Sequence, residues 1–318
     1  MELPDFADEI SQTHEADKRM TNTKIQFGKT LSPILNNPYE EPLYHYDTDV
    51  EGNLDYDNVR EGRRPFAMEV NLDTKRKNGQ GQLFTGDDLY EEDENAKFIN
   101  TMRDEVKKWR TNGYPRATRI TRELLNFWFN NPERQIDKQL FFCQREAVET
   151  AIYLNEVADA DPNVGRSLLH QLERRQQTMS EDYESILPRT AFKMATGTGK
   201  TVVMAMLILY HFVNKKEYPQ DTRFADHFLI VAPGITIRDR LGVLLPDDNR
   251  DSKDYYVARG LVPDNHRHWI DGLRTVITIT NYHVFEPKVL QGKKSSPTDG
   301  KKGGTDGKED FSNVLSRV

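Results

Sequence analysis

The stretch KMATGTGKT, residues 193–201, decides the fold of this 318-residue chain. A loop that binds phosphate needs backbone N–H groups turned inward on an anion and a helix N-terminus behind them. Gly197 and Gly199 tolerate the positive φ that such a turn requires, and Lys200 follows in the pattern T-G-T-G-K-T. The general pattern G-x-x-x-x-G-K-[ST] would place glycine where this chain has Met194. We therefore expect Met194 to keep an ordinary extended backbone.

The residues of this loop have distinct expected roles. Lys200 can reach the β- and γ-phosphates of a nucleotide and is the expected catalytic residue, and the hydroxyl of Thr201 suits Mg²⁺. The alternative is a glycine turn that happens to contain a lysine. The residues expected to bind ATP are Thr196, Gly197, Thr198, Gly199, Lys200 and Thr201.

The sequence around the loop predicts short strands that alternate with helices. We expect a strand over residues 189–194, a helix over 199–214, a buried strand over 227–232, a helix over 235–244 and a third strand over 275–280. This alternation is typical of an α/β fold with a parallel sheet and flanking helices.

Upstream of the loop the apolar residues recur at helical spacing. We expect helices from about Ala96, from about Thr118, and over residues 140–157. Residues 159–187 are polar, and we expect only that they lie at the surface. The division that follows is an arm over 1–95, a helical segment over 96–187, and an α/β part over 188–318 with a flexible linker over 291–310.

The acidic charge of the chain lies in the arm. Residues 1–95 hold 10 Lys and Arg against 22 Asp and Glu, whereas the formal net charge of the whole chain is −7. The total charge therefore neither excludes nor favours a nucleic-acid partner. The arm is predicted to be mostly extended or disordered, with two islands, residues 34–46 and 61–66, apolar enough to dock on a folded body.

Composition excludes several classes of protein. Cys143 is the single cysteine, so an internal disulfide framework and a multi-cysteine zinc site are excluded. The longest apolar run, residues 202–213, is too short to span a membrane, and the acidic N-terminus has no apolar signal region. We expect a soluble, cytoplasmic protein that does not contact a membrane.

A family resemblance rests on the stretches MATGTGKT, FFCQREAVETAIYL, FLIVAPGITIRDRL and VITITNYHVF. Together they resemble the motor subunits of restriction enzymes within helicase superfamily 2, closest to the Res subunit of type III restriction endonucleases. The likeness extends to ILNNPYEEP and EGRRPF in the arm. It implies an incomplete RecA-like P-loop NTPase domain, preceded by a helical segment, with ATP and Mg²⁺ as cofactors.

The resemblance also implies roles outside the phosphate loop. Gln144 matches a glutamine that reads the edge of adenine; the alternative is an ordinary polar residue in the first turn of a helix. Two further segments match parts that face DNA, and for the first of them, which begins at Ala232, the alternative is a strand-to-helix turn with solvated arginines. The residues expected to contact DNA are Pro233, Gly234, Thr236, Arg238, Thr280 and Asn281.

ATP hydrolysis in this family needs an acidic motif after an apolar strand, and no strand of this chain is followed by one. The nearest pair, Asp247 and Asp248, follows a predicted helix. We expect the N-terminal portion of an ATP-dependent helicase or translocase, without its second RecA-like domain and nuclease domain. Its expected partners are double-stranded DNA and a modification methyltransferase subunit. The alternatives are a regulatory P-loop protein that does not act on DNA, and an inactive remnant.

Overall fold

The computed structural model describes residues 34–48, 53–66, 86–179, 189–247, 253–285, 289–290 and 307–308. Most of the predicted linker and Asp248 lie outside these residues. The chain divides into two compact units, residues 1–101 and 102–318, and each is described by itself. The predicted three-part division stays a prediction.

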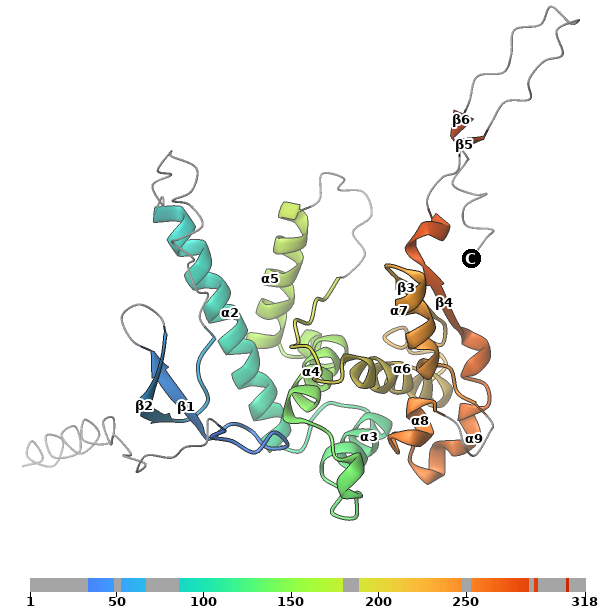
Figure 1. Cartoon of the computed structure of the whole chain (residues 1–318), viewed down its shortest axis with the longest axis horizontal. Coiled ribbons are helices and arrows are strands. Elements are labelled where there is room, and N and C mark those ends of the chain that lie inside the picture. Colours follow the sequence, from blue (N-terminus) through green and yellow to red (C-terminus); the bar gives the residue numbers. More distant parts are fainter. Residues whose placement is uncertain are drawn as a thin grey trace, which may run out of the picture. The chain divides into compact units, whose positions relative to one another are not determined.

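The first unit contains an antiparallel hairpin of β1, Tyr44–Thr48, and β2, Leu54–Glu61 (Figure 1). The side chain of Asn36 holds the backbone at the start of β1. Its Oδ1 accepts hydrogen bonds from the amides of Leu43 and Tyr44 at 2.8 and 3.0 Å, and its Nδ2 donates to the Tyr44 carbonyl at 2.8 Å. Part of the predicted extended arm is therefore β-structure, in which β1 and β2 pair with each other and Asn36 satisfies backbone groups at the start of β1.

Helix α2, Gly86–Thr111, begins ten residues ahead of the predicted start at Ala96. The helix thus includes the acidic run that suggested an extended chain. In the first unit, the side chain of Asn100 on α2 holds the Phe66 backbone, accepting from its N–H at 2.8 Å and donating to its carbonyl at 2.9 Å. The second predicted island thus contacts a helix.

The second unit is centred on α6, which packs against α3 and α4 and contacts α8 (Figure 1). Ten residues of α6 are buried, in agreement with its apolar composition nearly all round. Thr118 caps α3 by accepting from the Thr121 amide at 3.0 Å. The helices of this layer are α3 (Arg119–Phe129), α4 (Phe142–Ile152, continued by a π-turn over Tyr153–Val157), α5 (Val164–Met179) and α6 (Lys200–Glu217).

Helix α5 was not predicted from the sequence. Its residues are mostly polar, so the sequence predicts only that this stretch lies at the surface. Leu168 is nevertheless fully buried, and Leu169 and Leu172 line a pocket beside α4. Leu168 and Leu172 are four residues apart and therefore lie on one face, which is a short amphipathic signal inside a polar stretch.

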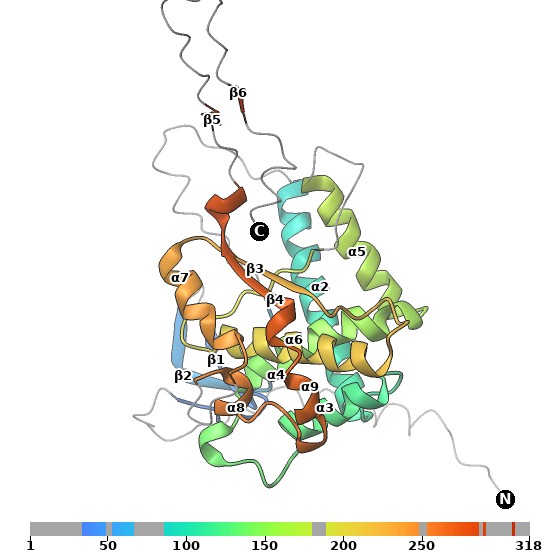
Figure 2. The same cartoon turned by 90° about the vertical axis from the view of Figure 1, so that its right-hand side faces the viewer.

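A small parallel sheet follows α6. It pairs β3, Phe228–Ala232, with β4, Ile277–Asn281, in the register Ile230 opposite Ile279 (Figure 2). The described residues of the connection between the two strands form three short α-helices: α7 (Ile235–Arg240, extended by a 3₁₀ turn over Leu241–Leu244), α8 (Tyr255–Ala258) and α9 (Arg267–Ile270). The fold is therefore α/β with a parallel sheet, as predicted, and a RecA-like domain stays a prediction.

Two predictions for strands were wrong. Residues 189–194 run without a strand partner and are mostly exposed, because in the described part of the chain no strand lies beside them. Strand β3 is buried on one face only, with Leu229 and Val231 of the other face exposed. A continuous apolar run indicates a strand covered on both faces, and in the described part of the chain this sheet has a layer on one face only.

The described part of the chain contains no helix that is long and apolar enough to cross a membrane. Beyond β4, two-residue strands β5 (Val289–Leu290) and β6 (Gly307–Lys308) pair in antiparallel fashion.

Candidate nucleotide-binding site

The glycine loop in front of α6 has the backbone that the sequence predicts. Gly197 and Gly199 adopt φ of +83° and +77°, and Gly199 is the N-cap of α6. Met194 does not have a positive φ, so a side chain at this position is compatible with the loop. In the first turn of α6 the Val202 N–H donates to the Gly199 carbonyl at 2.9 Å, which leaves the N–H groups of Lys200 and Thr201 without acceptors inside the helix, and the helix dipole adds positive charge there. This end of α6 is suited to an anion.

Lys200 turns its ammonium group back onto the loop. Its Nζ donates to the carbonyl oxygens of Met194 and Ala195 at 3.0 and 2.9 Å. The hydroxyl of Thr198 also donates to the Ala195 carbonyl, at 2.7 Å. An ammonium has three N–H donors, so one remains for a further acceptor. Thr196 and Lys200 are exposed and Thr201 is half-buried, so the residues predicted to bind a nucleotide are grouped at an accessible turn.

Gln144 lies against the same loop although it is 54 positions away from Thr198. Its Nε2 donates to the Thr198 carbonyl at 3.0 Å, and its Oε1 accepts from the Phe141 amide at 2.9 Å. Only 4% of the residue is exposed. The structure thus brings Gln144 and the glycine loop together, as the resemblance implies, and both atoms of its amide already have protein partners.

The residues predicted to face DNA meet at one edge of the sheet. Ala232 and Asn281 are opposite each other at the carboxyl ends of β3 and β4, so the segments that follow the two strands start side by side. Pro233 and Thr236 are exposed there, and Gly234 is the N-cap of α7. Thr280 lies one pair earlier, opposite Val231.

Charge at this edge is partly compensated. Arg238 on α7 contacts the neighbouring Asp239, with Nε and a terminal guanidinium nitrogen at 3.0 and 2.8 Å from the same carboxylate oxygen. Both side chains are exposed, so solvent screens this pair strongly. The carbonyl oxygen of the Asn281 side chain is buried without a hydrogen-bond partner in the described part of the protein.

The order of these features along the chain agrees with one known family. Residues 137–243 match the type III restriction enzyme res subunit. The resemblance seen in the sequence is confirmed for this ResIII segment, which contains Gln144, the glycine loop and the residues at the start of α7. Thr280, Asn281 and the two islands of the arm lie outside it. No curated protein and no solved structure matches the chain.

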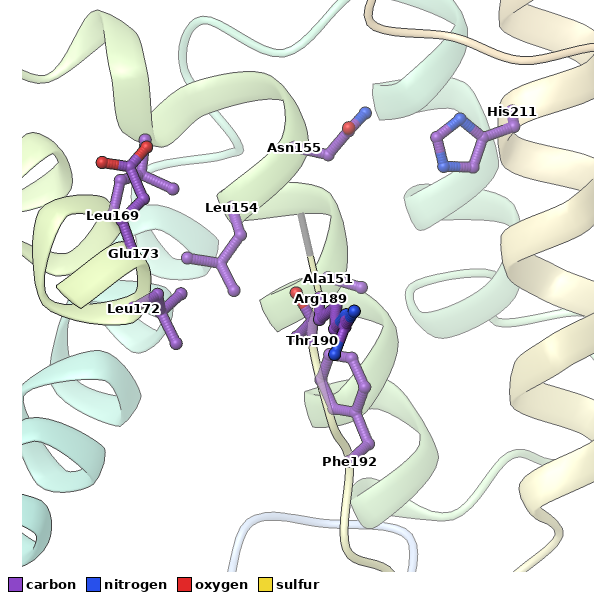
Figure 3. A pocket seen from close by; sticks show the side chains of 10 residues that line it. All are labelled: Ala151, Leu154, Asn155, Leu169, Leu172, Glu173, Arg189, Thr190, Phe192 and His211. Carbon is purple, nitrogen blue, oxygen red and sulfur yellow. The ribbon is translucent and has the colours of Figure 1, made fainter. Parts of the chain in front are cut away.

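A pocket of about 300 Å³ lies between α4, α5 and α6 and is also lined by the segment ahead of the glycine loop (Figure 3). Apolar side chains of Leu154, Leu172 and Phe192 line it together with His211 of α6. The Nδ1 atom of His211 is buried without a hydrogen-bond partner in the described residues, and burial lowers the pKa of this imidazole to about 4. One signal of this environment is visible in the sequence, since His211 interrupts an otherwise apolar run.

A buried carboxylate connects α4 to the end of α2 and to the turn that follows α2. Glu149 of α4 is fully buried and accepts from the guanidinium groups of Arg110 and Arg145, with the closest N–O distances at 2.6 and 2.8 Å, and from the Tyr114 hydroxyl at 2.6 Å. Burial and the adjacent Glu149 raise the pKa of Tyr114, which keeps this hydroxyl a donor. Sequence periodicity did not predict this network, because its members come from three separate segments.

Proposed function

We propose that this chain is the ATP-binding part of a DNA helicase or translocase motor in a type III restriction-like endonuclease. One observation carries the proposal: a glycine loop with two positive-φ glycines precedes the 18-residue helix α6 inside the ResIII segment. In such a motor, Mg²⁺-bound ATP supplies the free energy of its hydrolysis. The activity belongs to the hydrolase class that the family implies.

The residues at the loop fit a triphosphate. Gly197 and Gly199 turn the backbone so that N–H groups face an anion, and the N-terminus of α6 adds its dipole. Lys200 donates its remaining N–H, and the ammonium is released from Met194 and Ala195 when stronger anionic acceptors are present. Thr201 offers a hydroxyl oxygen, the kind of ligand that Mg²⁺ prefers.

The proposed DNA contacts lie at the carboxyl edge of β3 and β4. Gly234 and Thr236 would hold phosphates of one strand through an N–H group and a hydroxyl, and Arg238 would exchange its exposed contact with Asp239 for a phosphate. The proposed partners are double-stranded DNA, a modification methyltransferase subunit, and the remaining helicase and nuclease regions of the motor.

Replacement of Lys200 tests nucleotide binding. Lys200→Ala should weaken Mg-ATP binding roughly ten- to hundredfold, because a charge-assisted contact to phosphate contributes about 1.5 to 3 kcal/mol. Titration calorimetry on the 318-residue protein measures this change. Lys193→Ala, which removes an exposed lysine of the same charge just ahead of the loop, should bind as the wild type does. Equal affinity of Lys200→Ala and wild type would exclude the assignment.

DNA binding separates the proposed motor from a nucleotide-binding protein that does not act on DNA. Arg238→Ala should weaken binding of a double-stranded oligonucleotide uniformly across sequences and reduce the dependence of binding on salt. Fluorescence anisotropy at several salt concentrations measures both quantities. A chain that binds Mg-ATP but no DNA would favour the alternative.

A further inference from the structure

The side chain of Gln144 supports the glycine loop from the side of α4. Its Nε2 donates to the Thr198 carbonyl at 3.0 Å, while its Oε1 accepts from the Phe141 amide at the start of α4. One buried amide therefore ties the first turn of α4 to the turn that precedes α6.

The absence of a side chain at Gly199 makes room for this amide. A Cβ atom added at Gly199 would lie 2.2 Å from Nε2 of Gln144, well inside van der Waals contact. The φ of +77° at Gly199 disfavours other residues as well. Glycine is thus required at this position both by its backbone and by the space that Gln144 occupies.

The hydrogen bond from Gln144 to the Thr198 carbonyl fixes the direction of the Gly199 N–H group. The peptide bond between Thr198 and Gly199 is planar and trans, so its C=O and N–H point in opposite directions. Because Gln144 holds the Thr198 carbonyl, the Gly199 N–H is directed away from Gln144. We propose that Gln144 is a positioning residue, which orients the amide of Gly199 toward phosphate and acts on the triphosphate rather than on the base.

This role differs from the reading of adenine that the resemblance implies. Nε2 of Gln144 keeps a second N–H and Oε1 a second lone pair, but only 4% of the residue is exposed, so the groups that would read a base are not accessible to one. The inference rests on the proposed function, since it assumes that the loop binds phosphate. ATP, GTP and inorganic tripolyphosphate share the group that Gln144 would affect.

Binding of these three ligands tests the inference on the 318-residue protein with Mg²⁺. Gln144→Ala should weaken all three by a similar factor, about three- to tenfold, which corresponds to the loss of one buried hydrogen bond. Gln144→Met keeps most of the side-chain volume but has no donor, so it should weaken all three as well. Gln139→Ala, which removes an exposed glutamine five positions earlier, is the matched control and should change nothing.

Several outcomes would overturn the inference. A loss confined to ATP would identify Gln144 as a base reader. Wild-type affinity of Gln144→Met for all three ligands would show that the side chain only fills space. A wild-type protein that binds none of the three ligands would instead overturn the proposed function.

Unfolding without any nucleotide tests the contact separately. Gly199→Ala should destabilise the wild type more than it destabilises Gln144→Ala, because the second background no longer holds the amide that the new methyl group meets. Urea unfolding of the four proteins in this double-mutant cycle measures the coupling. Equal destabilisation in both backgrounds would contradict the contact between Gln144 and Gly199, whatever the protein binds.

Discussion

His211 is a single residue whose protonation is coupled to folding. Burial lowers its pKa to about 4 in the folded protein, below the value of 6.5 for an exposed imidazole. The folded state therefore disfavours the charged form, and stability is fully present above pH 6.5 and is lost as the pH falls toward 4. The loss amounts to about 1.4 kcal/mol for each pH unit inside this window.

Replacement of His211 should remove this dependence. Between pH 6.5 and pH 5 the free energy of unfolding should fall by about 1.5 kcal/mol more in the wild type than in His211→Phe, which keeps a ring beside Tyr210 and Phe224. Urea unfolding at a series of pH values measures the difference. His170→Phe changes an exposed histidine of α5 and should leave the pH profile of the wild type intact. Identical profiles for wild type and His211→Phe would refute the prediction.

Single residues of the glycine loop were predictable because their chemistry is local. Positive φ at Gly197 and Gly199 follows from the turn that the motif requires, without knowledge of the rest of the fold. The contact of Gln144 with Thr198 was not predictable from spacing, since it joins two turns that tertiary packing alone brings together. The same holds for His211, whose environment depends on α4 and α5.

At the scale of elements, the Glu149 network fastens α4 to the end of α2 and to the turn that follows it. Glu149 accepts from Arg110, Arg145 and Tyr114, and it is fully buried. Removal of a buried partner leaves the remaining charges desolvated and unpaired, which costs much more than the loss of an exposed ion pair.

Glu149→Ala should therefore lower the free energy of unfolding by about 3 to 5 kcal/mol. Asp159→Ala removes the partner of Arg166 from an ion pair in which both side chains are exposed, and it should cost less than about 1 kcal/mol. Urea unfolding compares the two variants directly. Similar small losses in both would show that solvent reaches the Glu149 network.

Elements with strong periodicity were predicted well, and elements that depend on a distant neighbour were not. Helices α3, α4 and α6 follow from their apolar spacing, and β3 and β4 were placed within two residues of their bounds. Residues 189–194 carry the composition of a strand, but a strand forms only when another backbone lies beside it. The sequence cannot indicate whether that neighbour is present.

At the scale of the second unit, the parallel sheet is covered on one face only. Ile230 and Ala232 of β3 are buried, whereas Leu229 is 54% exposed and Val231 is 45% exposed. The facing positions on β4 are Thr278 and Thr280. Parallel sheets are almost always covered on both faces, so an apolar face of this kind favours association with another surface.

We expect the protein to self-associate through this face as its concentration rises. The double substitution Leu229→Thr and Val231→Thr makes this face polar while threonine, a β-branched residue, remains suited to a strand. It should therefore lower the concentration dependence of the sedimentation coefficient. Ile136→Thr is the control, because Ile136 is 83% exposed but lies apart from the sheet in a 3₁₀ turn, and single exposed apolar residues do not drive association. Sedimentation velocity over a range of concentrations distinguishes the two. If the double variant associates as strongly as the wild type, association uses a different surface. If Ile136→Thr abolishes association as well, the effect reflects the total exposed apolar area and not the exposed face of the sheet.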